Sequence, residues 1–172
     1  MNEANPTQKL GKYMLGGAWV VILAILIAFF NDWGEKQANP NRSPEARSGG
    51  GINEVTLYRN RQHQYLADGE INGMPVTFMV DTGASAVAVP PITAERLGLV
   101  KGRKNFAHTA NGVTEIFITQ IESLSLGTIE LNDVPAGITM GMGEGLVLLG
   151  MSALRNIEFT HRDGVLTLKQ YR

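Results

Sequence analysis

The 172-residue sequence contains no cysteine. This absence excludes disulfide bonds, zinc sites built on cysteine and thiol catalysis. A strong charge of either sign is also missing, because the formal net charge is -1 and the lysines and arginines are scattered along the chain. Without a basic stripe, the composition gives no reason to expect a nucleic-acid partner.

Signals for metals, nucleotides and nucleophilic serine are weak. His63, His108 and His161 are spread along the chain without the spacing of metal ligands. Residues 141–145 are rich in glycine, but the Lys-Ser/Thr pair of a phosphate-binding loop does not follow them. Ser85 lies outside a Gly-x-Ser-x-Gly motif, which argues against a serine hydrolase. We therefore expect no metal and no other cofactor.

One long apolar run is present near the N-terminus. Residues 14–30 carry no charge, and with the preceding residues the run reaches about 20 residues, enough for a helix to cross a bilayer. Trp19 and Trp33 lie near its ends, where interfacial aromatics occur. A cleaved signal peptide is the alternative, but the run is long and no Ala-x-Ala site follows it. We expect residues 1–12 to form a short tail and residues 13–33 a retained transmembrane anchor.

The charges that flank this run give only a small preference for one orientation. Lys9 and Lys12 precede it, whereas Lys36, Arg42 and Arg47 follow it, so the positive-inside count is nearly balanced. The short tail and the closeness of its two lysines to the run favour an N-terminus inside the cell.

The rest of the chain divides by composition into a linker and a folded domain. Residues 34–51 are rich in Pro, Asn, Ser and Gly and contain no aromatic or β-branched residue, which predicts a flexible linker. Residues 52–172 are then the folded domain. Asn72-Gly73 and Asp163-Gly164 each separate two apolar runs, a pattern typical of β-hairpins. Helical signals are short, at residues 91–97 and 152–156, so we expect an all-β domain with one or two short helices.

The tripeptide Asp81-Thr82-Gly83 is the candidate centre of chemistry. It follows the apolar run at residues 76–80, so the carboxylate of Asp81 would stand at the tip of a strand. Gly83 permits a tight turn and a close approach of backbone, Thr82 offers a hydroxyl that could lock the loop, and Ser85 can hydrogen-bond locally. The plain alternative is a β-turn in which Asp and Gly have their usual turn roles.

A carboxylate of this kind is useful as one of a pair. Two carboxylates held about 3 Å apart cannot both ionise easily, so they share a proton, as is well known for aspartic proteases. One can then act as a base that activates water, while the other acts as an acid toward a carbonyl.

The sequence resembles the retropepsin-like aspartic proteases at three places. The segment FMVDTGASAVAVP, residues 78–90, resembles their active-site segment, and residues 146–151 resemble the apolar strand that crosses behind it before a short helix. Residues 109–113 fall where the family has its flap hairpin. The resemblance implies that Asp81 is catalytic and that its neighbours support the loop, with Ala at position 84 as in viral members. The residues implied are Thr82, Gly83, Ala84 and Ser85 for the loop, and Thr109, Ala110, Asn111, Gly112 and Val113 for the flap and substrate binding.

The resemblance also implies a dimer, because the chain has one Asp-Thr-Gly triplet in a domain of half the size of a pepsin-like enzyme. Each chain would give one Asp81 across a two-fold axis, Thr82 would brace the loop of the partner, and a terminal strand such as residues 165–168 would pair across the interface. With its anchor, the chain resembles the membrane-anchored proteases of bacteria. This implies a single pass through the inner membrane, a periplasmic catalytic domain and a polypeptide substrate.

Two functions remain open on the sequence. The first is a membrane-anchored aspartic endopeptidase with an all-β, retropepsin-like single-lobe domain. The second is a non-catalytic, membrane-anchored module of the same fold that binds peptides or assembles with partners.

Overall fold

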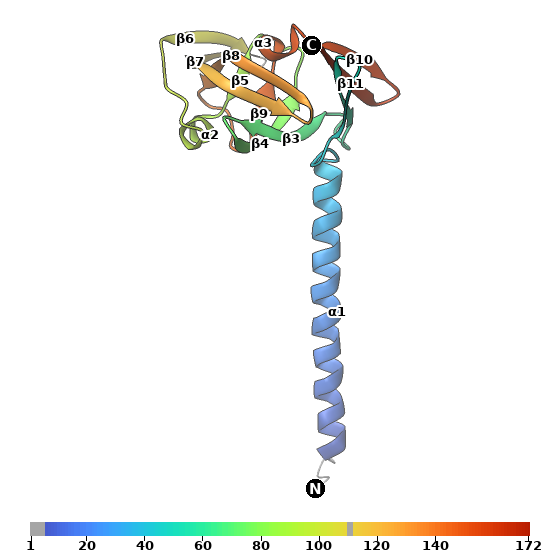
Figure 1. Ribbon diagram of the computed structural model, residues 1–172. Helices are drawn as coiled ribbons and strands as arrows, with labels where there is room; N and C mark the ends of the chain where they lie inside the picture. The colour runs from blue at the N-terminus through green and yellow to red at the C-terminus, as the bar shows by residue number, and fades with distance from the viewer. Residues whose placement is uncertain (1–5, 110–111) are drawn as a thin grey trace. The chain divides into compact units, whose positions relative to one another are not determined.

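The computed structural model describes residues 6–109 and 112–172 (Figure 1). The chain divides into two compact units, the first ending at Gln37 and the second comprising Ala38–Arg172. Helix α1 (Pro6–Ala38) accounts for the described part of the first unit.

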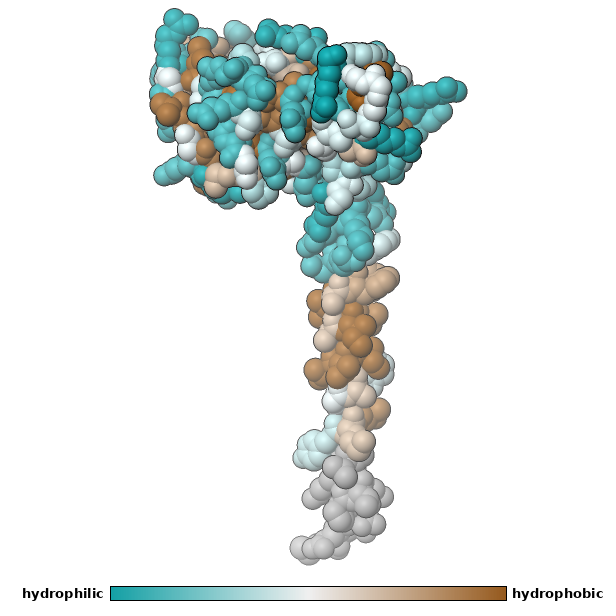
Figure 2. Space-filling view, viewed as in Figure 1, coloured by the Kyte–Doolittle hydropathy of each residue, from teal (hydrophilic) through white to brown (hydrophobic). Residues whose placement is uncertain are grey.

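Helix α1 is long and apolar enough to cross a membrane, by length and composition, over Tyr13–Ala38. Its large apolar side chains from Tyr13 to Trp33 are exposed on all sides, and Figure 2 shows many of them as a brown band on the helix. Polar contacts begin near its C-terminal end, where Lys36 forms an ion pair with Asp32 at 2.7 Å. An apolar surface around the whole helix is typical of a membrane span.

The described residues of the second unit form two sheets and two short helices. Strands of the larger sheet lie in the order β3-β4-β9-β5-β8-β7-β6, and β3 also pairs with β7, which closes this sheet on itself. Its strands are β3 (Leu66–Ile71), β4 (Met74–Val80), β5 (Val87–Val89), β6 (Lys104–Thr109), β7 (Gly112–Leu126), β8 (Ile129–Thr139) and β9 (Leu146–Leu149). The smaller sheet has the order β1-β2-β11-β10, with β1 (Glu45–Gly49), β2 (Ile52–Tyr58), β10 (Glu158–Arg162) and β11 (Val165–Tyr171). The helices are α2 (Pro91–Arg96) and α3 (Met151–Leu154).

Both predicted hairpins are present, and their turns explain why the sequence signals them. Asn72 and Gly73 have φ angles of 50° and 73°, and Asp163 and Gly164 have φ angles of 52° and 80°. Two successive residues with positive φ form the turn that matches the twist of antiparallel strands, and Asn, Asp and Gly adopt it most easily. The all-β fold with short helices is therefore confirmed.

Apolar side chains from both sheets and both short helices form one core. Phe78 on β4, Ile138 on β8 and Val147 on β9 are fully buried, as are Val55 and Leu168 on the smaller sheet. The strand that precedes Asp81 is thus fixed on its buried face by close packing.

The predicted linker over residues 34–51 differs from the structure. Helix α1 continues to Ala38, and β1 pairs with β2 from Glu45 opposite Thr56 to Gly49 opposite Ile52. Asn41, which is 2% exposed, donates from Nδ2 to the carbonyl oxygens of Tyr58 and Leu66 at 2.8 and 2.6 Å. Its Oδ1 accepts the N–H of Tyr58 at 2.7 Å. The composition predicts a flexible linker, but this amide side chain substitutes for a backbone partner and ties the segment to the domain.

Substitution of this asparagine tests how firmly the segment is held. Asn41→Ala removes three hydrogen bonds and leaves buried backbone groups unpaired, so we expect the free energy of unfolding to fall by about 2–3 kcal/mol. Urea unfolding of the full chain in detergent, followed by the circular dichroism of its strands, measures this. The control is Asn105→Ala, which removes an exposed asparagine. Equal stability of the two variants would contradict a structural role for Asn41.

The expectation that residues 165–168 pair across a dimer interface is wrong in this structure. These residues lie in β11, which is bordered by β2 on one side and by β10 on the other. Both of its hydrogen-bonding edges are therefore used within the chain. The sequence showed an apolar strand near the C-terminus but gave no sign that β2, more than a hundred residues earlier, would occupy its second edge.

Candidate active site

Asp81 stands directly after β4, at the tip of the strand, as predicted. Its N–H donates to the carbonyl oxygen of Leu149 at 3.2 Å, and its own carbonyl oxygen accepts the N–H of Ala84 at 3.2 Å. The carboxylate oxygen Oδ1 accepts the N–H of Gly83 at 2.9 Å. A Cβ on Gly83 would lie 3.2 Å from that oxygen, so glycine leaves the carboxylate room. The half-buried side chain of Asp81 is thus oriented by its own loop.

Strand β9 passes behind this loop. It pairs in parallel with β4 and antiparallel with β5, the strands before and after the loop. Beyond its end, the N–H of Met151 donates to the carbonyl oxygen of Ala84 at 2.8 Å. A Cβ on Gly150 would overlap the carbonyl oxygen of Ala86 and lie 2.7 Å from that of Ala84. Only a glycine lets the two backbone segments approach so closely.

A serine that the sequence did not single out also holds the loop. Ser152 Oγ accepts the N–H of Val87 at 2.9 Å and donates to the carbonyl oxygen of Pro135 at 2.7 Å. The hydroxyl therefore joins the start of β5 to β8, using its donor and its acceptor together. Its partners lie 65 and 17 residues away, so no local pattern could have marked it.

The predicted loop residues are arranged around Asp81 but differ in exposure. Thr82, Gly83 and Ser85 are exposed, and Ala84 is half-buried. Within the described part of the chain, the hydroxyls of Thr82 and Ser85 make no hydrogen bond. The loop of a single chain is therefore held by backbone groups, by Gly150 and by Ser152.

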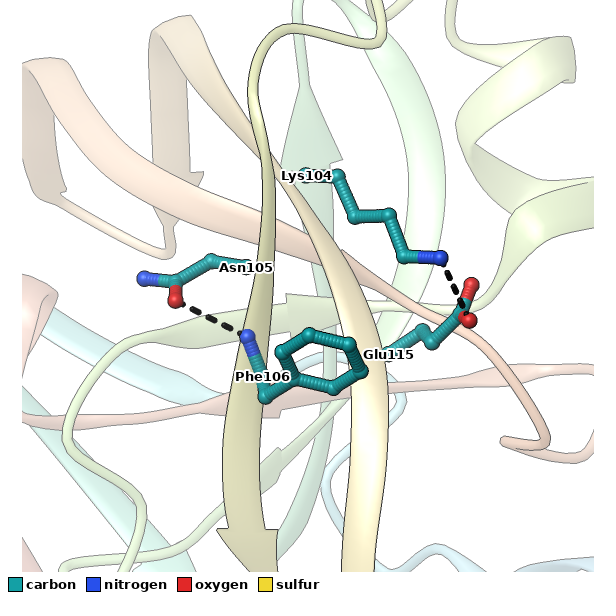
Figure 3. A network of polar contacts seen from close by, with 4 residues as sticks. All are labelled: Lys104, Asn105, Phe106 and Glu115. Carbon is teal, nitrogen blue, oxygen red and sulfur yellow. Dashed lines mark hydrogen bonds and ion pairs between the residues drawn. The ribbon is translucent and has the colours of Figure 1, made fainter.

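The predicted flap is a hairpin of β6 and the start of β7, in which His108 lies opposite Val113. Figure 3 shows its stalk, where Lys104 Nζ contacts Glu115 Oε1 at 2.6 Å and stands 5.5 Å from the centre of the Phe106 ring. Of the predicted flap residues, Gly112 and Val113 are exposed at the start of β7, and Thr109 ends β6. Ala110 and Asn111 lie outside the described residues.

A pocket of about 170 Å³ lies between the Asp81 loop and this hairpin. The loop side is built of small residues, and Ile116, Thr139 and Leu148 supply the larger ones. Its lining residues are Gly83, Ala84, Ser85, Ala86, Val87, Ala88, Ala107, His108, Ile116, Gly137, Thr139 and Leu148. A larger hollow of about 530 Å³, bordered by Leu99, Ile118 and Glu122, contains none of the predicted site residues. In the described ranges, no three acidic or histidine side chains gather where a metal ion could bind.

Comparisons with known proteins agree on one family. The model of the gag-polyprotein putative aspartyl protease family matches residues 67–156, slightly more than half of the chain, including Asp81, the flap hairpin and β9. An uncharacterised protein of Sinorhizobium sp. is 29% identical over 122 residues, and one of Rickettsia prowazekii (strain Madrid E) is 27% identical over 123. These alignments cover 69% and 70% of this chain, which spans about half (52%) of the length of each relative.

The fold has a solved counterpart. The crystal structure of a retropepsin-like aspartic protease from Rickettsia conorii matches with a TM-score of 0.58 and 24% identity, covering 74% of this chain and 94% of that chain. At 24% identity, this match shows a shared fold and not a shared activity. With the family match across the Asp81 segment, it leads to one conclusion: the chain belongs to the gag-polyprotein aspartyl protease family and has a retropepsin-like fold.

Proposed function

We propose that the protein is a membrane-anchored aspartic endopeptidase whose active site forms across a homodimer. The observation that carries the proposal is the placement of Asp81, a single carboxylate at a strand tip, held by the N–H of Gly83 beside an open pocket. In the described ranges no second carboxylate is arranged in this way, so the chemistry needs a second copy.

The reaction follows from a pair of Asp81 carboxylates that share one proton. The ionised carboxylate takes a proton from water, whose oxygen attacks the carbonyl carbon of the peptide bond, while the protonated one gives its proton to the carbonyl oxygen. The first carboxyl then gives the proton it took from water to the nitrogen, and the second, now ionised, takes a proton from a hydroxyl of the intermediate as the carbon–nitrogen bond breaks. The products are a new carboxyl group and a new amine.

The exposed residue Thr82 fits a role at the dimer axis. Its hydroxyl has no partner in the described part of its own chain. In a symmetric pair it would meet the loop of the other copy and fix the distance between the two carboxylates.

Anchoring by α1 supports dimer formation. Two chains confined to one membrane have a higher effective concentration than two chains free in solution. We place the protein in a bacterial inner membrane as a single-pass protein, with the N-terminus inside and the catalytic domain on the periplasmic side. The apolar helix and the lysines at positions 9 and 12 support this placement.

The small pocket suggests which substrates are preferred. Its volume of about 170 Å³ and its alanine- and glycine-rich lining suit one large apolar side chain of a polypeptide. Because the pocket borders the Asp81 loop, a substrate side chain bound in it would lie close to the bond that is cleaved.

Filling this pocket should change specificity. Gly137→Val adds bulk to the wall of the pocket, at a buried position where a Cβ would be 3.8 Å from Ile116, an ordinary contact, and circular dichroism checks that the variant keeps its fold. We expect cleavage next to large apolar residues to fall about 10- to 100-fold, and cleavage next to alanine to change little. Measurement of kcat/KM for paired peptides tests this, with Gly143→Val, in an open loop, as the control. An equal loss for both peptides would contradict the assignment of the pocket.

The function itself is tested with the full chain in lipid vesicles. A peptide library is incubated between about pH 3 and 8, and products are identified by mass spectrometry. Cleavage that is blocked by a peptide with a secondary alcohol in place of the scissile carbonyl supports the proposal. A dimer that binds peptides but cleaves none over this range would instead favour a binding module.

A further inference from the structure

Strand β10 leaves one edge of the smaller sheet open. In the described part of the chain it pairs with β11 alone, and all five of its residues are exposed. The other edge strand, β1, is held to its own sheet by the hydroxyl of Thr128, which donates to the carbonyl oxygens of Arg47 and Glu54 at 3.2 and 3.3 Å. An open strand edge is a ready template for pairing with another chain.

The turn after β10 determines which of its peptide groups face outward. Arg162 and Val165 flank the two-residue turn and form a register pair. Residues that flank such a turn bond to each other, and bonded and non-bonded positions then alternate along the strand. Thus Glu158, Thr160 and Arg162 direct their backbone groups toward β11, and Phe159 and His161 direct theirs to the open edge.

The sequence of β10 is Glu-Phe-Thr-His-Arg. When two copies of this strand run antiparallel, the glutamate of each lies opposite the arginine of the other, and the phenylalanine lies opposite the histidine. We propose that β10 pairs antiparallel with β10 of a second copy about a two-fold axis at Thr160. Phe159 then lies opposite His161 of the other copy, and their outward groups form four backbone hydrogen bonds, about the most that this edge allows. Glu158 lies opposite Arg162 of the other copy, which places opposite charges together twice.

The charged ends of β10 are free to make these contacts. Arg162 reaches only Asp163 within the described chain, at 3.5 Å, and both side chains are almost 90% exposed (88% and 89%). Such a pair contributes little to stability, so Arg162 can change partner. Glu158 Oε2 accepts the hydroxyl of Tyr171 at 2.6 Å, a bond that raises the pKa of Tyr171 and leaves Oε1 to accept from an arginine.

Contacts link this edge to Asp81. The carbonyl oxygen of Tyr65 accepts the N–H of Val80, the residue before Asp81, at 2.9 Å. The ring of Tyr65 stacks edge-on with His161 of β10, with centroids 5.8 Å apart. Tyr65 therefore connects β10 to the residue that precedes Asp81. The inference rests on the proposed function in one respect, since that function requires the second copy.

Cysteine crosslinking tests the register, and the absence of native cysteine makes each new thiol unique. At the axis the two Cα atoms of residue 160 would be about 4.5 Å apart, within the range of a disulfide. Two copies of residue 159 would be about 8 Å apart, which is too far. We expect Thr160→Cys in the full chain in lipid vesicles to form a disulfide dimer under mild oxidation at least about 10 times faster than Phe159→Cys. Equal rates would overturn the proposed pairing.

Charge exchange provides an independent test. Glu158→Arg alone and Arg162→Glu alone each place like charges together twice, so each variant should dimerise more weakly. When the two variants are mixed, both pairs become opposite in sign, and energy transfer between fluorophores on the two chains should return to the level of the original protein. Failure of the mixture to recover would overturn the inference. Crosslinking without peptide cleavage would contradict the proposed function alone, and cleavage by a chain that fails both tests would contradict only the pairing.

Discussion

Asp81→Asn is expected to lower peptide cleavage by at least about 10³-fold. The amide cannot take a proton from water at the required step, and it cannot share a proton with the carboxylate of the other copy. The loop should remain folded, because the amide oxygen can still accept the N–H of Gly83. The measurement is kcat/KM on the best peptide from the library, with unfolding recorded in parallel. Asp133→Asn, which changes an exposed aspartate in β8, is the matched control.

Mixing the inactive and active chains separates a shared site from two independent ones. When equal amounts are combined in detergent and reconstituted together, about a quarter of the pairs contain two intact chains. If both Asp81 side chains are needed, activity should fall to about a quarter of that of the unmixed protein. Activity of about one half would mean that each chain works alone, and would contradict the dimeric site even if Asp81 is essential.

Features determined by neighbouring residues could be predicted from the sequence. Asn72-Gly73 and Asp163-Gly164 form turns because of their own backbone preferences, and both hairpins are present. The helix expected at residues 91–97 begins at Pro91, and Gly98 follows its end with a φ of 68°. The position of Asp81 at a strand tip likewise follows from the apolar run before it.

Features determined by distant residues could not be predicted. Asn41 belongs to a segment whose composition is typical of a linker, yet its amide joins backbone groups 17 and 25 residues away. The sequence predicts Ser152 only as part of a short helix, although its hydroxyl joins β5 to β8. The place of β11 between β2 and β10 also follows from sheet order, which the hydrophobic pattern of one strand does not encode.

Gly150 depends both on its neighbours, the apolar strand before it, and on distant residues, the loop that contains Asp81. Its substitution is expected to be among the most damaging in the chain. Gly150 directly follows the apolar run at residues 146–149, and the structure shows why a glycine stands there. A Cβ at this position would overlap the carbonyl oxygen of Ala86 and approach that of Ala84. Neither oxygen belongs to a flexible side chain that could turn away, so the backbone of the loop or of β9 must move.

Gly150→Ala should therefore affect both stability and catalysis. We expect the free energy of unfolding to fall by about 1–3 kcal/mol, as in other overpacked sites. We expect kcat to fall by about 100-fold in the fraction that remains folded, since a shift of about 1 Å in the Asp81 loop misplaces the carboxylate. Urea unfolding and active-site titration of the folded protein measure the two effects separately. Gly143→Ala, at a glycine with nothing within 4 Å of its added Cβ, should change neither quantity. If Gly150→Ala is less stable but has an unchanged kcat, then β9 supports the fold without setting the position of Asp81.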